Sequence, residues 1–381
     1  MSRWQPVSVS MKWCVNALLK PKVKGHKALF KQFTIQAPSV VIAAELQRKI
    51  DNKTKPLGAL GELESIAFQL GKIQQTLTPD VSKPKMIVFA ADHGVVAQGI
   101  SLFPQEVTPQ MVMNFLMGGA AVSVFCAQHN VPLRVVDVGV NAELDAHPLL
   151  GSRKVAFASK DFSQQAAMTT EQLEQALQAG VDEANLAIDD GVNLLMFGEM
   201  GIGNTCVSSC MMTALIGVSA IDSAGRGTGL DSAGVSHKAQ VIEQALQRAE
   251  QETGQIMADW SAQTLAEQVG GFEILAMAGA MLQSAQRQTA FVVDGFICSV
   301  ALLFAQKVAP NVRDYAIFAH QSNEKAHKVL LDHLQAEPML SLDLRLGEGS
   351  GAILAYPLMN SACVFLNKMA SFESAGVSGA P

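Results

Sequence analysis

Apolar residues recur in two patterns along this chain, one typical of helices and one typical of buried strands. Between residues 40 and 76 they recur every three or four positions, which indicates helix, and Lys55-Pro56-Leu57-Gly58 divides this stretch into two helices. Continuous apolar runs indicate strands that are covered on both faces of a sheet. Five such runs have the length of a strand, at residues 85–91, 133–140, 193–197, 289–293 and 315–319.

Helical patterns separate the predicted strands. They cover residues 106–128, 170–187, 205–216, 236–252, 266–283, 296–307, 324–334 and 352–371. The alternation of strands and helices predicts an α/β fold with a Rossmann-like parallel sheet and helices on both of its faces. The first helices and the last one lie outside this alternation, so we expect them to form a small helical lobe.

These patterns divide the chain into three parts. Residues 1–39 form a basic extension that we expect to be poorly ordered, residues 40–84 and 352–381 form the helical lobe, and residues 85–351 form a large α/β domain. The first 44 residues contain seven Lys or Arg residues and no Asp or Glu. A targeting peptide is the alternative, but this segment lacks a long apolar core followed by a small-residue cleavage site.

Composition excludes several classes of function. The net charge of −6 argues against nucleic acid as a partner, and no apolar run reaches the roughly 20 residues of a membrane span. The six cysteines have no paired spacing and the histidines no metal-ligand spacing. We therefore expect buried, reduced thiols in a cytoplasmic protein without a metal site, and the 49% of apolar residues leaves room for a subunit interface.

Polar and glycine-containing motifs follow four of the predicted strands. They are Asp92-His93-Gly94, Gly198-Glu199, Asp294-Gly295 and Ala319-His320-Gln321. Ligands of open α/β sheets bind at the carboxyl ends of the strands, so we expect these loops to meet in one crevice. A histidine at a strand end more often makes structural hydrogen bonds, and we expect that role for His93 and His320.

Two glycine-rich loops could bind a phosphate. Gly201, Gly203, Asn204 and Thr205 follow a predicted strand and open a helix, where backbone N–H groups have no partner within the helix. The loop is neither a Walker loop nor the dinucleotide fingerprint. The alternative is a tight turn with an Asn or Thr cap.

The second loop contains Gly225, Arg226, Gly227 and Thr228, and it adds a cation and further backbone amides. Lys238 lies a little beyond it and could reach a phosphate as a point charge. The alternative is that Lys238 is an ordinary lysine on the surface.

One carboxylate stands inside a third glycine-rich segment, Arg345–Gly351. A desolvated Glu348 in this segment would have a raised pKa and could act as a general base. The alternative is a carboxylate that caps the helix expected from residue 352. Glu199 in the first glycine-rich loop has the same two interpretations.

Taken together, the motifs resemble those of the nicotinate-nucleotide–dimethylbenzimidazole phosphoribosyltransferase family of cobalamin biosynthesis. The resemblance extends from about residue 40 to the last helix. It rests on Lys55–Gly61, Ala91–Val95, Pro104–Thr108, Gly198–Thr205, Gly225–Gly229, Val269–Glu273, Val293–Phe296 and Arg345–Gly349.

The resemblance implies a homodimeric enzyme that needs no metal or other cofactor. Its substrates would be the small molecules nicotinate mononucleotide and 5,6-dimethylbenzimidazole, and its products α-ribazole 5′-phosphate and nicotinate, with inversion at C1′. The rival hypotheses are another nucleotide-processing α/β enzyme, such as a kinase, and a non-catalytic nucleotide-binding regulator.

The resemblance also implies roles for individual residues. Glu348 would accept the proton of the benzimidazole, and Glu199 would be the second catalytic carboxylate. The two glycine-rich loops and Lys238 would bind the phosphate. The base-binding residues would be Phe103, Pro104, Gln110, Met111, Met200 and Leu346.

The chain departs from the family pattern at three places. Lys325-Ala326 stands where relatives often carry Pro-Gly, so the shape of this loop is not implied by the resemblance. Phe103 and Cys206 each replace a hydroxyl residue. Because Phe103 could narrow the base pocket, the preference among benzimidazoles, purines and phenols stays open.

Overall fold

A computed structural model describes residues 33–378 of the protein, with one parallel sheet at its centre. The strand order is β3-β2-β1-β4-β5-β6, and every pairing is parallel. The predicted α/β fold is confirmed, although the pattern did not predict the short strand β3. The strands are β1 (Pro84–Ala91), β2 (Leu133–Gly139), β3 (Leu150–Ser152), β4 (Leu194–Met200), β5 (Ala290–Val293) and β6 (Ala316–Phe318).

The strand order reverses at the centre of the sheet. Strand β1 lies between β2 and β4, and Val88 of β1 is in register with Val135 on one side and with Gly198 on the other. The carboxyl ends of parallel strands share one edge, and the crevice at such a reversal is the usual ligand site of this sheet type. The topology therefore places the expected site next to the ends of β1 and β4.

Most predicted helices are present, and two are divided. The stretch 106–128 forms α3 and α4, since Gly118 takes a left-handed φ of 80°. The stretch 266–283 belongs to α9 and α10, because the backbone at Gly270 and Gly271 is extended. The helices of this domain are α3 (Val107–Leu116), α4 (Ala121–Gln128), α5 (Thr170–Asp189), α6 (Asn204–Ile216), α7 (Ala220–Ser223), α8 (Ser232–Thr253), α9 (Ala262–Val269), α10 (Phe272–Gln286), α11 (Phe296–Val308) and α12 (Lys325–His333).

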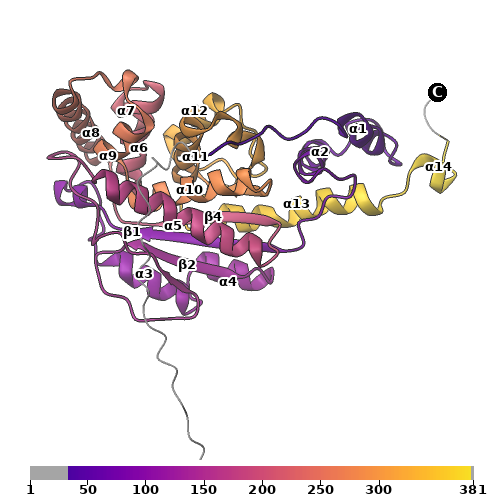
Figure 1. The fold of residues 1–381 in the computed structure, drawn as a ribbon, viewed down its shortest axis with the longest axis horizontal. Helices are drawn as coiled ribbons and strands as arrows, with labels where there is room; N and C mark the ends of the chain where they lie inside the picture. Colours follow the sequence, from indigo (N-terminus) through magenta and orange to yellow (C-terminus); the bar gives the residue numbers. More distant parts are fainter. Residues whose placement is uncertain (1–32, 379–381) are drawn as a thin grey trace, which may run out of the picture.

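Helices cover the sheet on both sides, with α3 and α4 on one side and α10 and α11 on the other (Figure 1). Helix α10 packs closely against α5. A Cβ atom on Gly180 of α5 would collide with the carbonyl group of Ala276, and one on Gly279 of α10 would collide with that of Leu177. The two glycines let the helix backbones touch.

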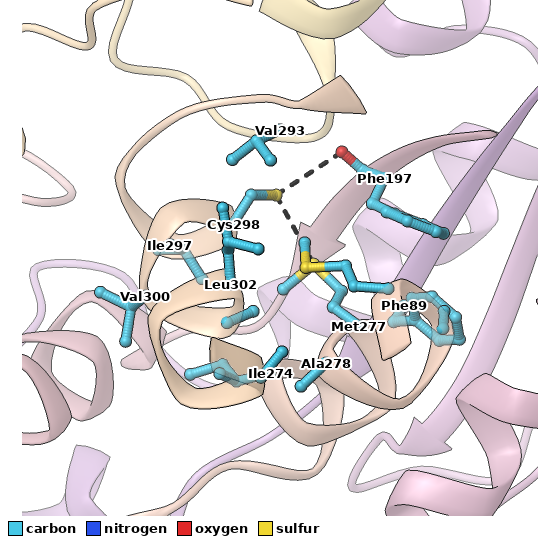
Figure 2. Close-up of a cluster of buried hydrophobic side chains, with 14 of the residues drawn as sticks. Phe89, Phe197, Ile274, Met277, Ala278, Val293, Ile297, Cys298, Val300 and Leu302 are labelled. Atoms are coloured by element: carbon cyan, nitrogen blue, oxygen red, sulfur yellow. Dashed lines mark hydrogen bonds between the residues drawn. The ribbon is translucent and has the colours of Figure 1, made fainter. Parts of the chain in front are cut away.

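The core between β4, α10 and α11 is apolar and contains a buried thiol (Figure 2). Sγ of Cys298 donates to the carbonyl oxygen of Phe197 at 3.5 Å and lies 3.5 Å from Sδ of Met277. Burial raises the pKa of the Cys298 thiol well above its ordinary value. The five described cysteines are free and buried, as expected, and Cys14 lies outside the described residues.

The terminal helices α1 (Ala43–Asp51), α2 (Glu62–Gln74), α13 (Ser350–Lys368) and α14 (Phe372–Ala375) lie together beyond one end of the sheet (Figure 1). The segment after α1 and the segment after α13 are joined directly. The backbone N–H of Phe372 donates to the carbonyl of Asn52 at 3.0 Å, and the ammonium of Lys53 donates to that of Met369 at 2.6 Å. Helix α13 begins at the sheet and reaches α2, so it connects this lobe with the carboxyl edge.

Residues 33–39, which we assigned to the basic extension, pack on the large domain. The amide of Asn311 donates to the carbonyl of Ile35 at 3.0 Å, and the hydroxyl of Tyr315 to that of Gln36 at 2.8 Å. Residues 1–32, the rest of the predicted extension, lie outside the described residues.

Among the described residues, one apolar helical stretch has the length and composition of a membrane span. It covers residues 107–128, and 39% of its apolar 18-residue window is buried. The stretch comprises two helices, α3 and α4, joined by a turn at residues 117–120. Length and composition alone do not distinguish a membrane span from a core or interface helix.

Candidate active site

A cavity of about 450 Å³ lies at the carboxyl edge of the sheet. The loops after β4, β5 and β6 form its walls, together with the 345–348 segment before α13 and the 100–103 segment before α3. The convergence of these loops, expected from the strand ends, is therefore present in the structure.

Twelve of the predicted site residues line this cavity. They are Phe103, Met111, Glu199, Met200, Gly201, Gly203, Asn204, Thr205, Gly227, Thr228, Leu346 and Glu348.

Five other predicted site residues do not line the cavity. Pro104 and Gln110 are exposed beside it, and Arg226 is exposed because its guanidinium donates to the carbonyl of Leu230 at 3.1 Å. Lys238 and Gly225 are buried behind the cavity wall. The roles of these five residues in ligand binding therefore stay predictions.

Glu348 projects into the cavity from a constrained backbone. Its φ is 65°, its side chain is buried, and Oε2 accepts from the backbone N–H of Val122 at 3.3 Å. Burial raises the pKa of Glu348, and the charge of Asp294 adds to this, whereas the bond from Val122 opposes it. The alternative of a cap for the helix that follows is not what the structure shows, since Gly349 occupies the N-cap of α13.

Glu199 lies next to Glu348 and holds its backbone. Oε1 of Glu199 accepts from the N–H of Glu348 at 3.3 Å, and Oε2 accepts from the side-chain amide of Asn204. Burial, together with the charges of Glu273 and Asp294, raises the pKa of Glu199 to about 8, and the two hydrogen bonds oppose this rise. Asn204 thus supports a carboxylate instead of capping α6.

Asp294 and His320, which were not among the predicted site residues, also line the cavity. Oδ1 of Asp294 accepts from the N–H of Ala352 at 2.8 Å, in the first turn of α13, and lies 3.8 Å from Nε2 of His320. Burial raises the pKa of Asp294. Asp294 therefore fixes the start of the helix that follows the Glu348 segment. Its position directly after a strand was the available signal for this residue.

Turn bonds use part of the backbone donors at the start of α6: the N–H of Asn204 donates to the carbonyl of Gly201 at 3.1 Å, and that of Cys206 to the carbonyl of Gly203 at 2.9 Å. Gly203 is the N-cap with a left-handed φ of 97°, and no side chain caps the helix. The N–H of Ile202 is already used, since it donates to Oγ1 of Thr108 at 3.1 Å. A Cβ on Gly201 would collide with the carbonyl of Ala91, which explains the glycine there.

The 225–229 loop is held from both sides. The ammonium of Lys238 donates to the carbonyl of Gly225 at 3.1 Å and to Oγ1 of Thr205 at 3.2 Å. Oε1 of Glu324 accepts from the N–H of Gly227 at 2.9 Å. Burial lowers the pKa of Lys238. Lys238 thus supports both glycine-rich loops in this structure, and its phosphate contact stays a prediction.

Comparison with known proteins agrees with this architecture. A family model described as "Phosphoribosyltransferase" matches residues 35–377. The chain belongs to this phosphoribosyltransferase family. It is 51% identical to the nicotinate-nucleotide–dimethylbenzimidazole phosphoribosyltransferase of Cupriavidus necator, over 88% of this chain and 95% of that protein. The enzyme of the same name from Aromatoleum aromaticum is 48% identical, over 91% of this chain and 98% of that protein.

Solved structures give the same result. The crystal structure of CobT from Thermus thermophilus superposes with a TM-score of 0.85 at 42% identity, and the match covers 89% of this chain and 99% of that one. The predicted membership of this phosphoribosyltransferase family is confirmed. Within residues 33–378, no group of three or more His, Cys, Asp or Glu residues could hold a metal ion.

The raised pKa of Glu199 predicts a pH effect on stability. Between the unfolded value of 4.5 and the folded value of about 8, the folded protein retains a proton that the unfolded chain has lost. The free energy of unfolding should therefore fall by up to about 1.4 kcal/mol per pH unit in this window. In Glu199→Gln the free energy of unfolding should fall less over this pH range, because glutamine does not titrate.

Urea unfolding at pH 5 and pH 8 measures this effect. Glu243→Gln, which removes an exposed carboxylate from α8, serves as the control and should follow the wild type. The same pH dependence in the wild type and in Glu199→Gln would contradict the assignment.

Proposed function

We propose that this phosphoribosyltransferase transfers the phosphoribosyl group of nicotinate mononucleotide to 5,6-dimethylbenzimidazole. The products are α-ribazole 5′-phosphate and nicotinate. The observation that carries the proposal is the buried carboxylate of Glu348, which faces a cavity that also holds two glycine-rich loops. The names of the related enzymes support the choice of substrates.

This reaction needs one base and no acid. The pyridinium of the nucleotide is already a cationic leaving group, so no proton is required to release nicotinate. The benzimidazole attacks C1′ through one ring nitrogen and must lose the proton on its other nitrogen. Glu348 accepts that proton, and its raised pKa makes it a stronger base than an exposed carboxylate.

The two ends of the cavity suit the two substrates. The phosphate binds at the start of α6, where the backbone donors after Gly203 have no cap, and next to Gly227 and Thr205. The flat base packs against Met111, Met200 and the other apolar residues of the opposite wall. Rings held on opposite faces of the ribose lead to inversion at C1′.

The test of this function is incubation of the protein with both substrates, followed by chromatography. We expect release of nicotinate together with a new phosphorylated riboside of the benzimidazole. A folded protein that releases no nicotinate would refute the proposal.

Removal of the base should slow turnover without preventing binding. We expect Glu348→Gln to lower kcat by about 10²- to 10⁴-fold, the usual contribution of a general base. The KM values should change little, because the amide keeps the shape of the side chain. Steady-state kinetics with Glu243→Gln as the control decides this, and wild-type turnover in Glu348→Gln would exclude the assigned role.

A homodimer in the cytoplasm fits the surface of the protein. Met113 and Met117 of the α3 region and Val124 of α4 are exposed, and Met117 is 81% exposed. Exposed apolar side chains on neighbouring elements are typical of subunit interfaces. The buried free thiols are typical of a reducing compartment.

A charge placed on this face should separate the subunits. We expect light scattering to give twice the chain mass of 40.5 kDa for the wild type and the single mass for Met117→Glu combined with Val124→Glu. Leu186→Glu, at a half-exposed position on α5, is the matched control. A dimer that survives the double substitution would place the interface elsewhere.

A further inference from the structure

The cavity is strongly unbalanced in charge. Among the described residues that line it, four are carboxylates, Glu199, Asp294, Glu324 and Glu348, whereas Arg345 is the only Lys or Arg. Burial raises the pKa of Glu199 and of Asp294, and neighbouring carboxylates add to the rise for Glu199. Arg345 is therefore the one cationic side chain among these lining residues, and the ammonium of Lys238 lies behind the wall, 3.2 Å from Oγ1 of Thr205.

Arg345 is directed toward the 225–229 loop. Its Nη1 donates to the carbonyl of Gly227 at 3.4 Å, and within residues 33–378 it forms no ion pair. The Cα of Gly227 lies close to Oγ1 of Thr205, because a Cβ there would lie 2.7 Å from that oxygen. The guanidinium is thus near the end of the cavity that contains Thr205 and the start of α6.

Arg345 is also close to the general base along the chain. Only two residues separate it from Glu348, and a Cβ on one of them, Gly347, would collide with Oε1 of Glu199. Arg345 and Glu348 therefore lie on one short segment, and Glu199 holds its backbone through the N–H of Glu348.

We propose that Arg345 binds the 5′-phosphate of the nucleotide and thereby couples recognition of the phosphate to the placement of Glu348. This inference rests on the proposed function. The phosphate is remote from the reacting C1′ atom, and binding energy from a remote group can be used to order the groups that react. A guanidinium suits this role, because its fork of N–H donors matches the oxygens of a phosphate.

The carboxylate of nicotinate is the other anion that Arg345 could bind. The contact with Gly227, on the side of Thr205, favours the phosphate. Two partial ligands separate these alternatives: ribose 5-phosphate has the phosphate without the carboxylate, and nicotinate riboside has the carboxylate without the phosphate.

Calorimetry of these two ligands with the wild type and with Arg345→Ala tests the proposal without any need for turnover. We expect Arg345→Ala to weaken binding of ribose 5-phosphate at least tenfold and that of nicotinate riboside less than threefold. Arg345→Lys should recover part of the lost affinity for ribose 5-phosphate, since lysine keeps the positive charge but lacks the planar N–H donors of the guanidinium. Arg287→Ala, which removes an exposed arginine paired with Asp189, should bind like the wild type.

Turnover of nicotinate mononucleotide completes the experiment. We expect Arg345→Ala to lower kcat as well as affinity, because the segment that carries Glu348 loses its contact with the phosphate. Selective loss of nicotinate riboside binding, equal losses for both ligands, or no loss for either would each overturn the proposal. Absence of turnover in the wild type would instead refute the proposed function, and the calorimetry would still show which anion Arg345 binds.

Discussion

The site depends on one backbone contact, that of Gly198 in β4 with the peptide of Glu348. A side chain on Gly198 would collide with the carbonyl oxygen of Glu348, so only glycine lets this segment lie against the strand. Glu348 itself has a φ of 65°, a conformation that costs a non-glycine residue on the order of 1–3 kcal/mol. The fold retains this strain at the residue whose carboxylate faces the cavity, which is typical of a functional site.

The same contact places several acidic groups together. Glu199 follows Gly198 directly, and it holds the N–H of Glu348, while Asp294 holds the first turn of the helix that begins after Glu348. Burial raises the pKa of each carboxyl, and neighbouring carboxylates add to the rise for Glu199 and Glu348. In the proposed reaction, the raised pKa makes Glu348 a stronger base, and Arg345 supplies a positive charge for the anionic substrate.

The sequence predicted the sheet and much of the site, because continuous apolar runs and glycine-rich loops report local conformation. It identified the acidic residues Glu199 and Glu348, but it did not predict which basic side chain faces the cavity. Arg226 and Arg345 stand in similar loops, but the carbonyl of Leu230 holds Arg226 outside. Lys238 is a normal helix residue by pattern, and the packing of α8 against α6 buries it behind Thr205. Whether a basic side chain reaches the cavity depends on contacts between segments that are distant in the sequence. The periodicity of apolar residues does not predict these contacts.

The most direct test of this account is the turnover of Gly198→Ala, measured beside its affinity for ribose 5-phosphate. The added methyl group should displace Glu348, and a displacement of about 1 Å can cost about 10²-fold in rate. We expect a loss of kcat of that order with an affinity for ribose 5-phosphate close to that of the wild type, which would also show that the protein is folded. Wild-type turnover in Gly198→Ala would contradict the claim that this backbone contact positions the base.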